Sequence, residues 1–182
     1  MLQTFKLFSQ SKLKRIGLAS LSLSLVTLLA SCGSNQADAG QYESTAKATY
    51  TWRVNYSNDP MDGKRGRDRE FESATLVNVN GEKPEGAVLQ DDKGIWWPKL
   101  PPKPTIDEME AGKKKSYEKI GKPELLRQVE YRVKFTQDGE KLNLPTNYSV
   151  YRQVAKNYPD TPLNFTMGVN NGSVTKATPV NN

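Results

Sequence analysis

The stretch of chain that decides the fold class reads Ala46-Lys47-Ala48-Thr49-Tyr50-Thr51-Trp52-Arg53-Val54-Asn55-Tyr56. Apolar and polar residues alternate along all of it. Because successive side chains of a β-strand point to opposite faces, this alternation predicts a strand with one buried and one solvated face. Such strands are typical of antiparallel sheets.

Further strands are expected on the C-terminal side of this stretch. Alternation and β-prone composition predict them over residues 71–79, 129–135, 142–144, 163–169 and 174–177. The turn-forming dipeptides between them are Asn80-Gly81, Asp138-Gly139 and Asn171-Gly172. A long charged loop is expected over residues 57–70. Because tight turns join antiparallel strands, most of these strands should pair with their neighbours in the chain.

One clear helix is expected near the C-terminus. Its apolar face has the spacing i, i+3, i+4 and i+7, formed by Tyr151, Val154, Ala155 and Tyr158. Either Thr146 or Asn147 is expected to cap its start, and Pro159 to end it.

The middle of the chain has a different character. Residues 94–104 contain four prolines, which favours extended polyproline II over a ladder strand. Thr105 and Glu108 match a capping box, and a short helix is expected from there to about Gly112. A further short helical segment is expected from Pro123 to Leu126.

The expected fold class is therefore α+β, mainly antiparallel β, as a small barrel or sandwich with one or two short helices. The order of hairpin, short helix and two more strands over residues 127–178 resembles small β-barrels of the SH3 or OB type. A single domain is expected over residues 45–180, long enough to bury a core.

The N-terminal residues have the character of an export signal. Four cations and no acid precede an apolar stretch from Leu18 to Ala30; the cations are Lys6, Lys12, Lys14 and Arg15. A helix of this stretch would span about 20 Å at ~1.5 Å per residue, which is short of the ~30 Å hydrocarbon core of a membrane.

The end of this segment, Leu29-Ala30-Ser31-Cys32, resembles the lipobox of bacterial lipoproteins. The resemblance implies diacylglycerol on Cys32, cleavage before it, and location on the extracytoplasmic face of a bacterial membrane. Residues 1–31 would then be the signal peptide and residues 32–44 a flexible tether. An ordinary signal peptide with a nearby cysteine is the alternative. Residues 94–104 and 121–159 are also similar to uncharacterised cyanobacterial lipoproteins, which implies no activity.

Composition narrows the function classes. The chain has 26 Lys and Arg against 20 Asp and Glu, but removing the expected signal leaves 22 cations against 20 acids. A nucleic-acid partner is therefore not expected. The chain has no histidine and only one cysteine, so histidine bases, cysteine zinc sites and disulfides are not expected in the exported part. No catalytic residue, metal or cofactor is predicted.

The most suggestive candidate site combines two tryptophans with prolines: Trp96, Trp97, Pro98 and Pro101. Indole faces stack on sugars and on proline-rich peptides, so this group predicts a surface for binding a protein or glycan. The alternative is internal packing, in which one or both indoles lie against the sheet while the prolines cross it.

Charged groups form weaker candidates. The cations of two clusters could meet an anionic membrane: Lys64, Arg65, Arg67 and Arg69, and Lys113, Lys114 and Lys115. Three acidic groups could bind Ca²⁺ or act as a carboxylate pair: Asp59 and Asp62, Asp91 and Asp92, and Asp107, Glu108 and Glu110. Solvated surface charge is the alternative for all of them.

Three functions are consistent with these observations. The first is a non-enzymatic accessory lipoprotein that binds an envelope or membrane-complex partner. The second is a structural spacer of the envelope. The third is a hydrolase of envelope glycans that uses two carboxylates.

Overall fold

A computed structural model describes residues 36–37, 41–58 and 66–180. The chain divides into two units, Met1–Ser31 and Cys32–Asn182, and every described residue belongs to the second. The expected export segment, Cys32, Lys64 and Arg65 lie outside the described residues. Within the described part of the chain, no helix has the length and apolar character that crossing a membrane requires.

The elements follow in the order β1 (Gln36–Ala37), β2 (Tyr42–Ser57), β3 (Arg67–Val79), β4 (Leu89–Gln90), β5 (Trp96–Trp97), α1 (Ile106–Glu110), β6 (Lys119–Ile120), β7 (Glu124–Gln137), β8 (Glu140–Thr146), α2 (Tyr148–Asn157), β9 (Leu163–Met167), a 3-10 turn (Val169–Asn171) and β10 (Val174–Pro179). The predicted α+β class with mainly antiparallel strands is confirmed.

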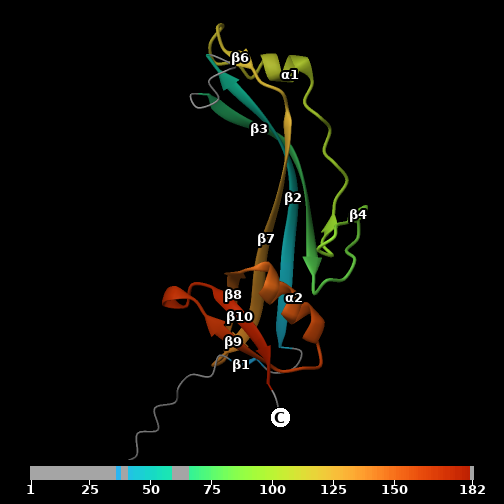
Figure 1. Ribbon diagram of the computed structural model, residues 1–182, viewed down its shortest axis with the longest axis vertical. Coiled ribbons are helices and arrows are strands. Elements are labelled where there is room, and N and C mark those ends of the chain that lie inside the picture. Colours follow the sequence, from blue (N-terminus) through green and yellow to red (C-terminus); the bar gives the residue numbers. More distant parts are fainter. Residues whose placement is uncertain (1–35, 38–40, 59–65, 181–182) are drawn as a thin grey trace, which may run out of the picture. The chain divides into compact units, whose positions relative to one another are not determined.

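The main sheet has the strand order β3-β2-β7-β8, and all its pairs are antiparallel (Figure 1). The central strand β2 pairs with β7 without interruption from Tyr42 opposite Phe135 to Arg53 opposite Glu124. On its other side it pairs with β3, where one register shift occurs between Thr51 and Arg53. At ~3.3 Å per residue, the 16 residues of β2 extend over about 50 Å.

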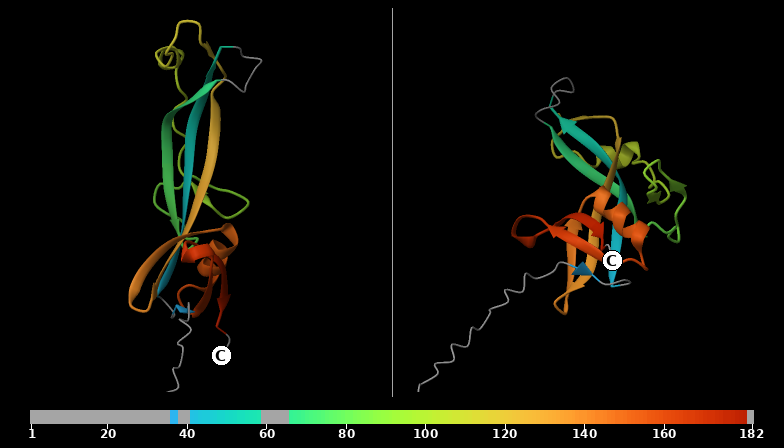
Figure 2. Two further views of the ribbon diagram at one scale, coloured as in Figure 1. Left: turned by 90° about the vertical axis from the view of Figure 1, so that its left-hand side faces the viewer. Right: turned by 60° about the horizontal axis from the view of Figure 1, so that its bottom comes forward.

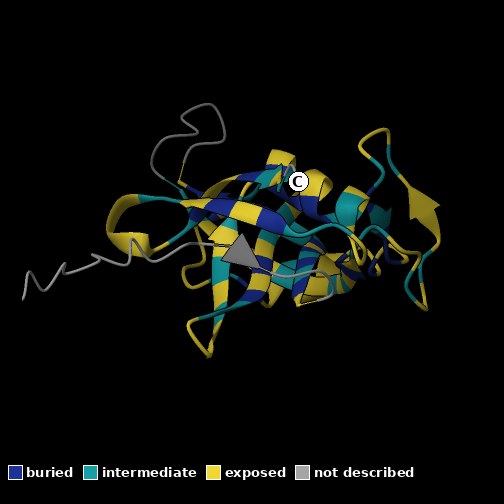
Figure 3. Cartoon of the chain, turned by 90° about the horizontal axis from the view of Figure 1, so that it is seen from below, coloured by how far each residue is buried: buried dark blue, intermediate teal, exposed yellow. Residues whose placement is uncertain are grey.

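The two faces of β2 differ as its sequence pattern predicts. Even-numbered residues from Tyr42 to Tyr56 point to one face and are buried, apart from half-buried Trp52. Odd-numbered residues from Glu43 to Asn55 are half-buried or exposed. Alternating bands of buried and exposed residues are visible along the strands in Figure 3. We call the first side the covered face and the second the bare face.

Near Tyr42, the covered face packs against α2 and a small antiparallel sheet of order β1-β9-β10. The core there consists of Tyr42, Val133, Phe135, Val150, Val154, Leu163, Phe165, Val174 and Ala177. A second cluster continues along the sheet with Ala46, Ala48, Tyr50, Ile95, Trp97 and Tyr151. Burial of an aliphatic or aromatic side chain stabilises by ~1.5–3 kcal/mol, so these two clusters hold the covering elements on the sheet.

Beyond β5, the covered face is crossed by extended chain. Pro98, Pro101 and Pro104 are buried, and the residues between them are exposed. Polyproline II has three residues per turn, so residues spaced by three lie on the same side. Burial of every third residue therefore shows that one side of this segment packs on the sheet. Trp52 Nε1 donates a hydrogen bond to the Pro101 carbonyl at 3.0 Å. We call residues 98–105 the proline strap; Figure 2 shows the extended chain running along β2, β3 and β7.

Several local predictions are confirmed. Asn147, and not Thr146, caps α2, because its side chain accepts the backbone N–H of Val150. The Thr105–Glu108 capping box is present at α1. Asp138 and Gly139 both have positive φ in the β7–β8 hairpin. Local hydrogen bonds and backbone preferences decide these features, so the sequence pattern alone predicts them.

Other predictions are wrong. Residues 124–126 belong to β7 and not to a helix, because Leu125 pairs with Trp52 and Leu126 with Thr51. Of the two predicted arrangements, barrel or sandwich, the barrel does not form, because β9 and β10 make a separate sheet. Instead of a ladder between β8 and β10, a side-chain bond joins Thr146 Oγ1 to the Val174 carbonyl at 2.7 Å.

The expected element boundaries also shift. β2 begins at Tyr42 and β1 pairs Gln36 with Asn164, so parts of the expected tether over residues 32–44 lie in strands. Trp96 and Trp97 form a two-residue ladder with Leu89 and Gln90, where only extended chain was expected. Val169 is 86% exposed in the 3-10 turn and is not part of β9.

Candidate binding surface

The predicted site around the tryptophans is largely internal. Trp97 is 4% exposed, and Pro98 and Pro101 are buried. The Trp97 ring lies 4.6 Å from the ring of Tyr50, centroid to centroid, on the covered face of the sheet. The side chains of these three residues cover the sheet, as the alternative of internal packing describes.

Trp96 is the one residue of this group with substantial exposure. It is half-buried, and the Lys83 ammonium lies 5.2 Å from its ring centroid. Backbone pairing with β4 turns Trp96 and Trp97 to opposite sides, which is why the two neighbours differ so much in burial. Any docking through the tryptophan pair depends on Trp96 alone.

Two polar residues hold this segment in place. The buried Asn78 of β3 accepts the Trp96 N–H at 2.7 Å and donates to the Trp96 carbonyl at 2.9 Å. Asp91 accepts the backbone N–H of Ile95 at 2.8 Å and the Trp97 indole N–H at 2.8 Å. The sequence predicted neither of these roles, and it indicated Asp91 only as a possible Ca²⁺ ligand or catalytic carboxylate. The available signal was the inward position of Asn78 in the alternation of β3, because a polar residue there needs hydrogen-bond partners.

The middle of the bare face is polar and ordered. Two cross-strand hydroxyl pairs lie next to each other, Thr49–Thr75 at 3.1 Å and Thr51–Ser73 at 2.9 Å. Cross-strand Thr and Ser pairs of this kind stabilise a sheet by ~0.2–1 kcal/mol each. Val77 and Val79 extend the same row on β3 and are 46% and 37% exposed.

A hollow of about 350 Å³ lies at the Asn55 end of the bare face. Arg53 lies between two acids in it, with Nη2 at 3.0 Å from Glu124 Oε2 and Nη1 at 3.6 Å from Asp68 Oδ2. The hydrogen bond to Glu124 and the charge of Asp68 raise the pKa of the Arg53 guanidinium. One guanidinium thus pairs with both carboxylates of this hollow.

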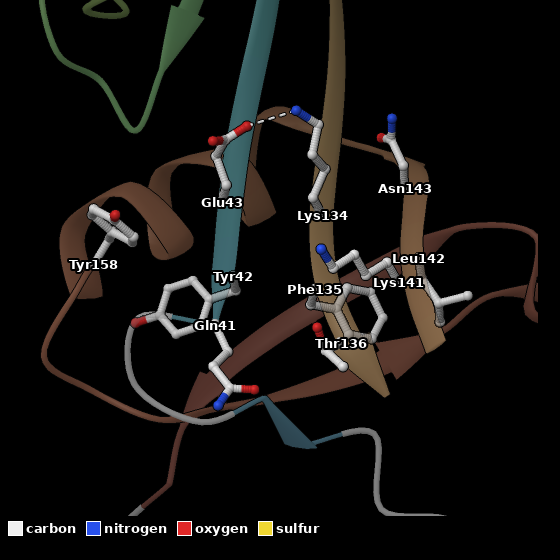
Figure 4. A pocket seen from close by; sticks show the side chains of 10 residues that line it. All are labelled: Gln41, Tyr42, Glu43, Lys134, Phe135, Thr136, Lys141, Leu142, Asn143 and Tyr158. Carbon is white, nitrogen blue, oxygen red and sulfur yellow. Dashed lines mark hydrogen bonds and ion pairs between the residues drawn. The ribbon is translucent and has the colours of Figure 1, made fainter. Parts of the chain in front are cut away.

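A second hollow, of about 500 Å³, lies at the Tyr42 end (Figure 4). Lys134 and Glu43 form an ion pair of 2.9 Å across its rim, and Lys141 reaches in from β8. Tyr158 closes the opposite side. Lys134 is already paired with Glu43, so Lys141 is the lining residue whose charge has no ion-pair partner among the described residues. The apolar part of the lining consists of the rings of Tyr42, Phe135 and Tyr158 and the side chain of Leu142.

Several described members of the predicted charged clusters have structural partners. Arg67 binds Glu118 with Nε–Oε1 at 3.0 Å and Nη2–Oε2 at 2.8 Å, and its guanidinium lies over the Tyr56 ring. The bond from Arg67 lowers the pKa of Glu118 to about 2. Glu108 caps α1, and Glu110 pairs with Lys113 at 2.8 Å. Among residues 41–58 and 66–180, no cluster of acids suits a metal ion.

No protein-family model, no curated protein and no solved structure matches this chain.

Proposed function

We propose that this chain is a lipid-anchored extracytoplasmic lipoprotein, a non-enzymatic accessory module that binds a protein partner in the bacterial envelope. The anchor rests on the Leu29-Ala30-Ser31-Cys32 motif and the basic, apolar segment before it. The binding role rests on the bare face of the main sheet.

The position of Cys32 sets the orientation of the domain. Only three residues separate Cys32 from β1, and the four residue-to-residue steps from Cys32 to Gln36 span at most about 14 Å. With lipid on Cys32, the end of the domain that carries β1, β9 and β10 faces the membrane. β2 then carries the bare face up to about 50 Å away from that end.

The bare face is the observation that carries the binding role. The chain covers one side of its long sheet with α2, the Trp97 segment and the proline strap, and among the described residues no element lies over the other side. Small-molecule sites are concave and mostly apolar, whereas protein interfaces are broad and polar at the rim. An open sheet face with ordered hydroxyls and paired charges fits a protein partner better than a small molecule.

A pair of crosslinking positions tests the binding role in cells. A photoreactive residue in place of Thr49 lies on the bare face, and the control in place of Gln153 lies on the exposed side of α2, on the covered face. We expect a specific adduct from the Thr49 position and none from the Gln153 position. Equal labelling from both positions would contradict a role for the bare face.

The anchor has its own test. Cys32→Ser should release the protein from membranes or leave an uncleaved precursor, because one side chain carries the whole attachment. Normal processing and membrane retention of this variant would refute the lipoprotein proposal.

The length of the strands also supports a second function, a spacer that holds two envelope layers apart. A spacer depends on length and not on surface chemistry. Deletion would then alter the envelope without loss of any complex, and the Thr49 position would give no specific adduct.

A further inference from the structure

β3 is one of the two edge strands of the main sheet, and no described strand pairs with its outer edge. It pairs only with β2, so the backbone groups on its other side lack ladder partners. Free strand edges bind other strands, and proteins usually protect them with charges, prolines or bulges.

The hydrogen-bond alternation identifies the outward groups. The N–H of Asn80 donates to the Ser44 carbonyl, which makes Asn80 and Ser44 a hydrogen-bonded pair. In an antiparallel ladder such pairs recur at every second residue, so Asn78, Leu76 and Ala74 also bond to β2. The backbone N–H and C=O groups of Ser73, Thr75 and Val77 consequently point away from the sheet.

The two halves of β3 are protected to different degrees. Between Arg67 and Glu72, five of six residues are charged, and the register shift against β2 lies within this half, between Glu70 and Ser73. Between Ser73 and Val79 there is no charge and no proline. Among the described residues, no hydrogen bond reaches the outward backbone groups of Ser73, Thr75 or Val77.

We propose that Ser73–Val77 is a strand-addition site, at which an extended segment of a partner protein continues the main sheet beyond β3. This proposal rests on the binding function above and names the edge and the class of partner. Main-chain hydrogen bonds supply the affinity in this mode of recognition, and alternate side chains supply the specificity.

The residues around this edge of β3 indicate which sequence the partner segment should have. On the bare face, the added strand lies beside Thr75, Val77 and Val79, which favours β-branched, uncharged residues. At one end it lies beside the exposed carboxylate of Glu72, which favours a lysine or arginine there. The partner segment is therefore an uncharged, β-branched strand of about five residues with a basic residue at one end.

A second copy of the chain fits this edge less well. Antiparallel pairing of two β3 edges would direct the long strands of the two copies in opposite directions. Two copies anchored through Cys32 in the same membrane must point the same way. The anchor therefore favours a different protein as the occupant.

Amide hydrogen exchange of the full-length protein, purified in detergent, tests the proposal. The probe is a blocked peptide of alternating valine and threonine with a lysine at one end, and the control peptide has proline at its centre. At ten times the Kd, bound peptide should slow exchange at Ser73, Thr75 and Val77 about tenfold. The control peptide should leave their exchange unchanged.

Two variants of Thr75 distinguish the contribution of its backbone N–H from that of its side chain. Thr75→Pro removes an N–H that points away from β2, so the ladder to β2 remains while the edge is blocked. Thr75→Val keeps the N–H and the β-branched shape. Peptide should protect the Val variant and not the Pro variant, and slow exchange at Leu76 in the Pro variant shows that β3 is still paired.

Each result bears on the proposal. Equal protection by both peptides, or no protection of the unaltered chain at about 1 mM peptide, overturns it; that concentration corresponds to about −4 kcal/mol of binding. Protection that rises with protein concentration and without peptide identifies a second copy as the occupant and also overturns it. A specific adduct at Thr49 would leave the binding function intact in either case.

Discussion

The strongest test of this fold is the substitution Asn78→Asp, which changes one side-chain NH2 group into an oxygen. Asn78 is fully buried and is the link between β3 and the Trp96 segment. Its Oδ1 accepts the Trp96 N–H, and the aspartate would keep that bond. Its Nδ2 donates to the carbonyls of Ala46 at 3.1 Å and Trp96 at 2.9 Å, and the aspartate would lose both bonds.

The size of the effect follows from these bonds. Each lost hydrogen bond costs ~1 kcal/mol, and a buried carbonyl left without a donor costs a further ~1–3 kcal/mol. The Ala46 carbonyl keeps its ladder bond from the backbone of β3, so the second cost applies mainly to Trp96. We expect a loss of about 3–5 kcal/mol in the free energy of unfolding at pH 7.

Lowering the pH should reduce this loss in the free energy of unfolding. Burial against carbonyl oxygens raises the pKa of the introduced carboxyl, and once protonated it donates one hydrogen bond again. Relative to the unaltered protein, the variant should therefore recover stability as the pH falls from 7 to 5. Urea unfolding at both pH values measures the difference directly.

Asn80→Asp is the matched control. Asn80 uses only its Oδ1, which accepts the Ser44 N–H at 2.8 Å and the Ser44 hydroxyl at 3.3 Å. An aspartate keeps both bonds, so its effect should stay within about 0.5 kcal/mol. Equal losses at the two positions, or a loss at Asn78 that grows in acid, would refute the reasoning.

Two further predictions use other parts of the covered face. Trp97→Ala should lower the free energy of unfolding by about 3–5 kcal/mol, whereas Trp96→Ala should cost about 1 kcal/mol or less because its ring is partly exposed; similar losses in urea unfolding would contradict the assignment of their burial. Glu118 has its pKa lowered from 4.5 to about 2, so its pairing with Arg67 stabilises the fold fully above pH 4.5 and loses that effect as the pH falls toward 2. Glu118→Gln should therefore flatten the pH dependence of the melting temperature in that range, and an unchanged slope would show that the pair is not formed.

The features that the sequence predicts well are those decided within a few residues. The alternation of residues 46–56, the Asp138-Gly139 turn and the Asn147 cap of α2 depend on backbone preference and on neighbouring side chains. The helix predicted at Pro123–Leu126 fails for the complementary reason. Its local signal is weak, and pairing of Leu125 and Leu126 with β2 outweighs it.

The same difference between local and tertiary contacts applies to the candidate site. The indoles and prolines at 96–101 are recognisable from the sequence as unusual, but the sequence does not say whether they face solvent. That outcome depends on Asn78 and Asp91 and on the apolar face of β2, all at a distance along the chain or on another element.

By itself, then, the sequence of this protein determined that β2 has an apolar and a polar face, and where turns and caps lie. Only the tertiary structure decided which face the chain covers and which edge it leaves open. The physical reason is that alternation is a property of a single strand. Covering a face of the sheet requires contacts between segments far apart in the chain, and the sequence pattern does not show which segments meet. The proline strap occupies the covered face, and the described residues leave the bare face and the outer edge of β3 uncovered.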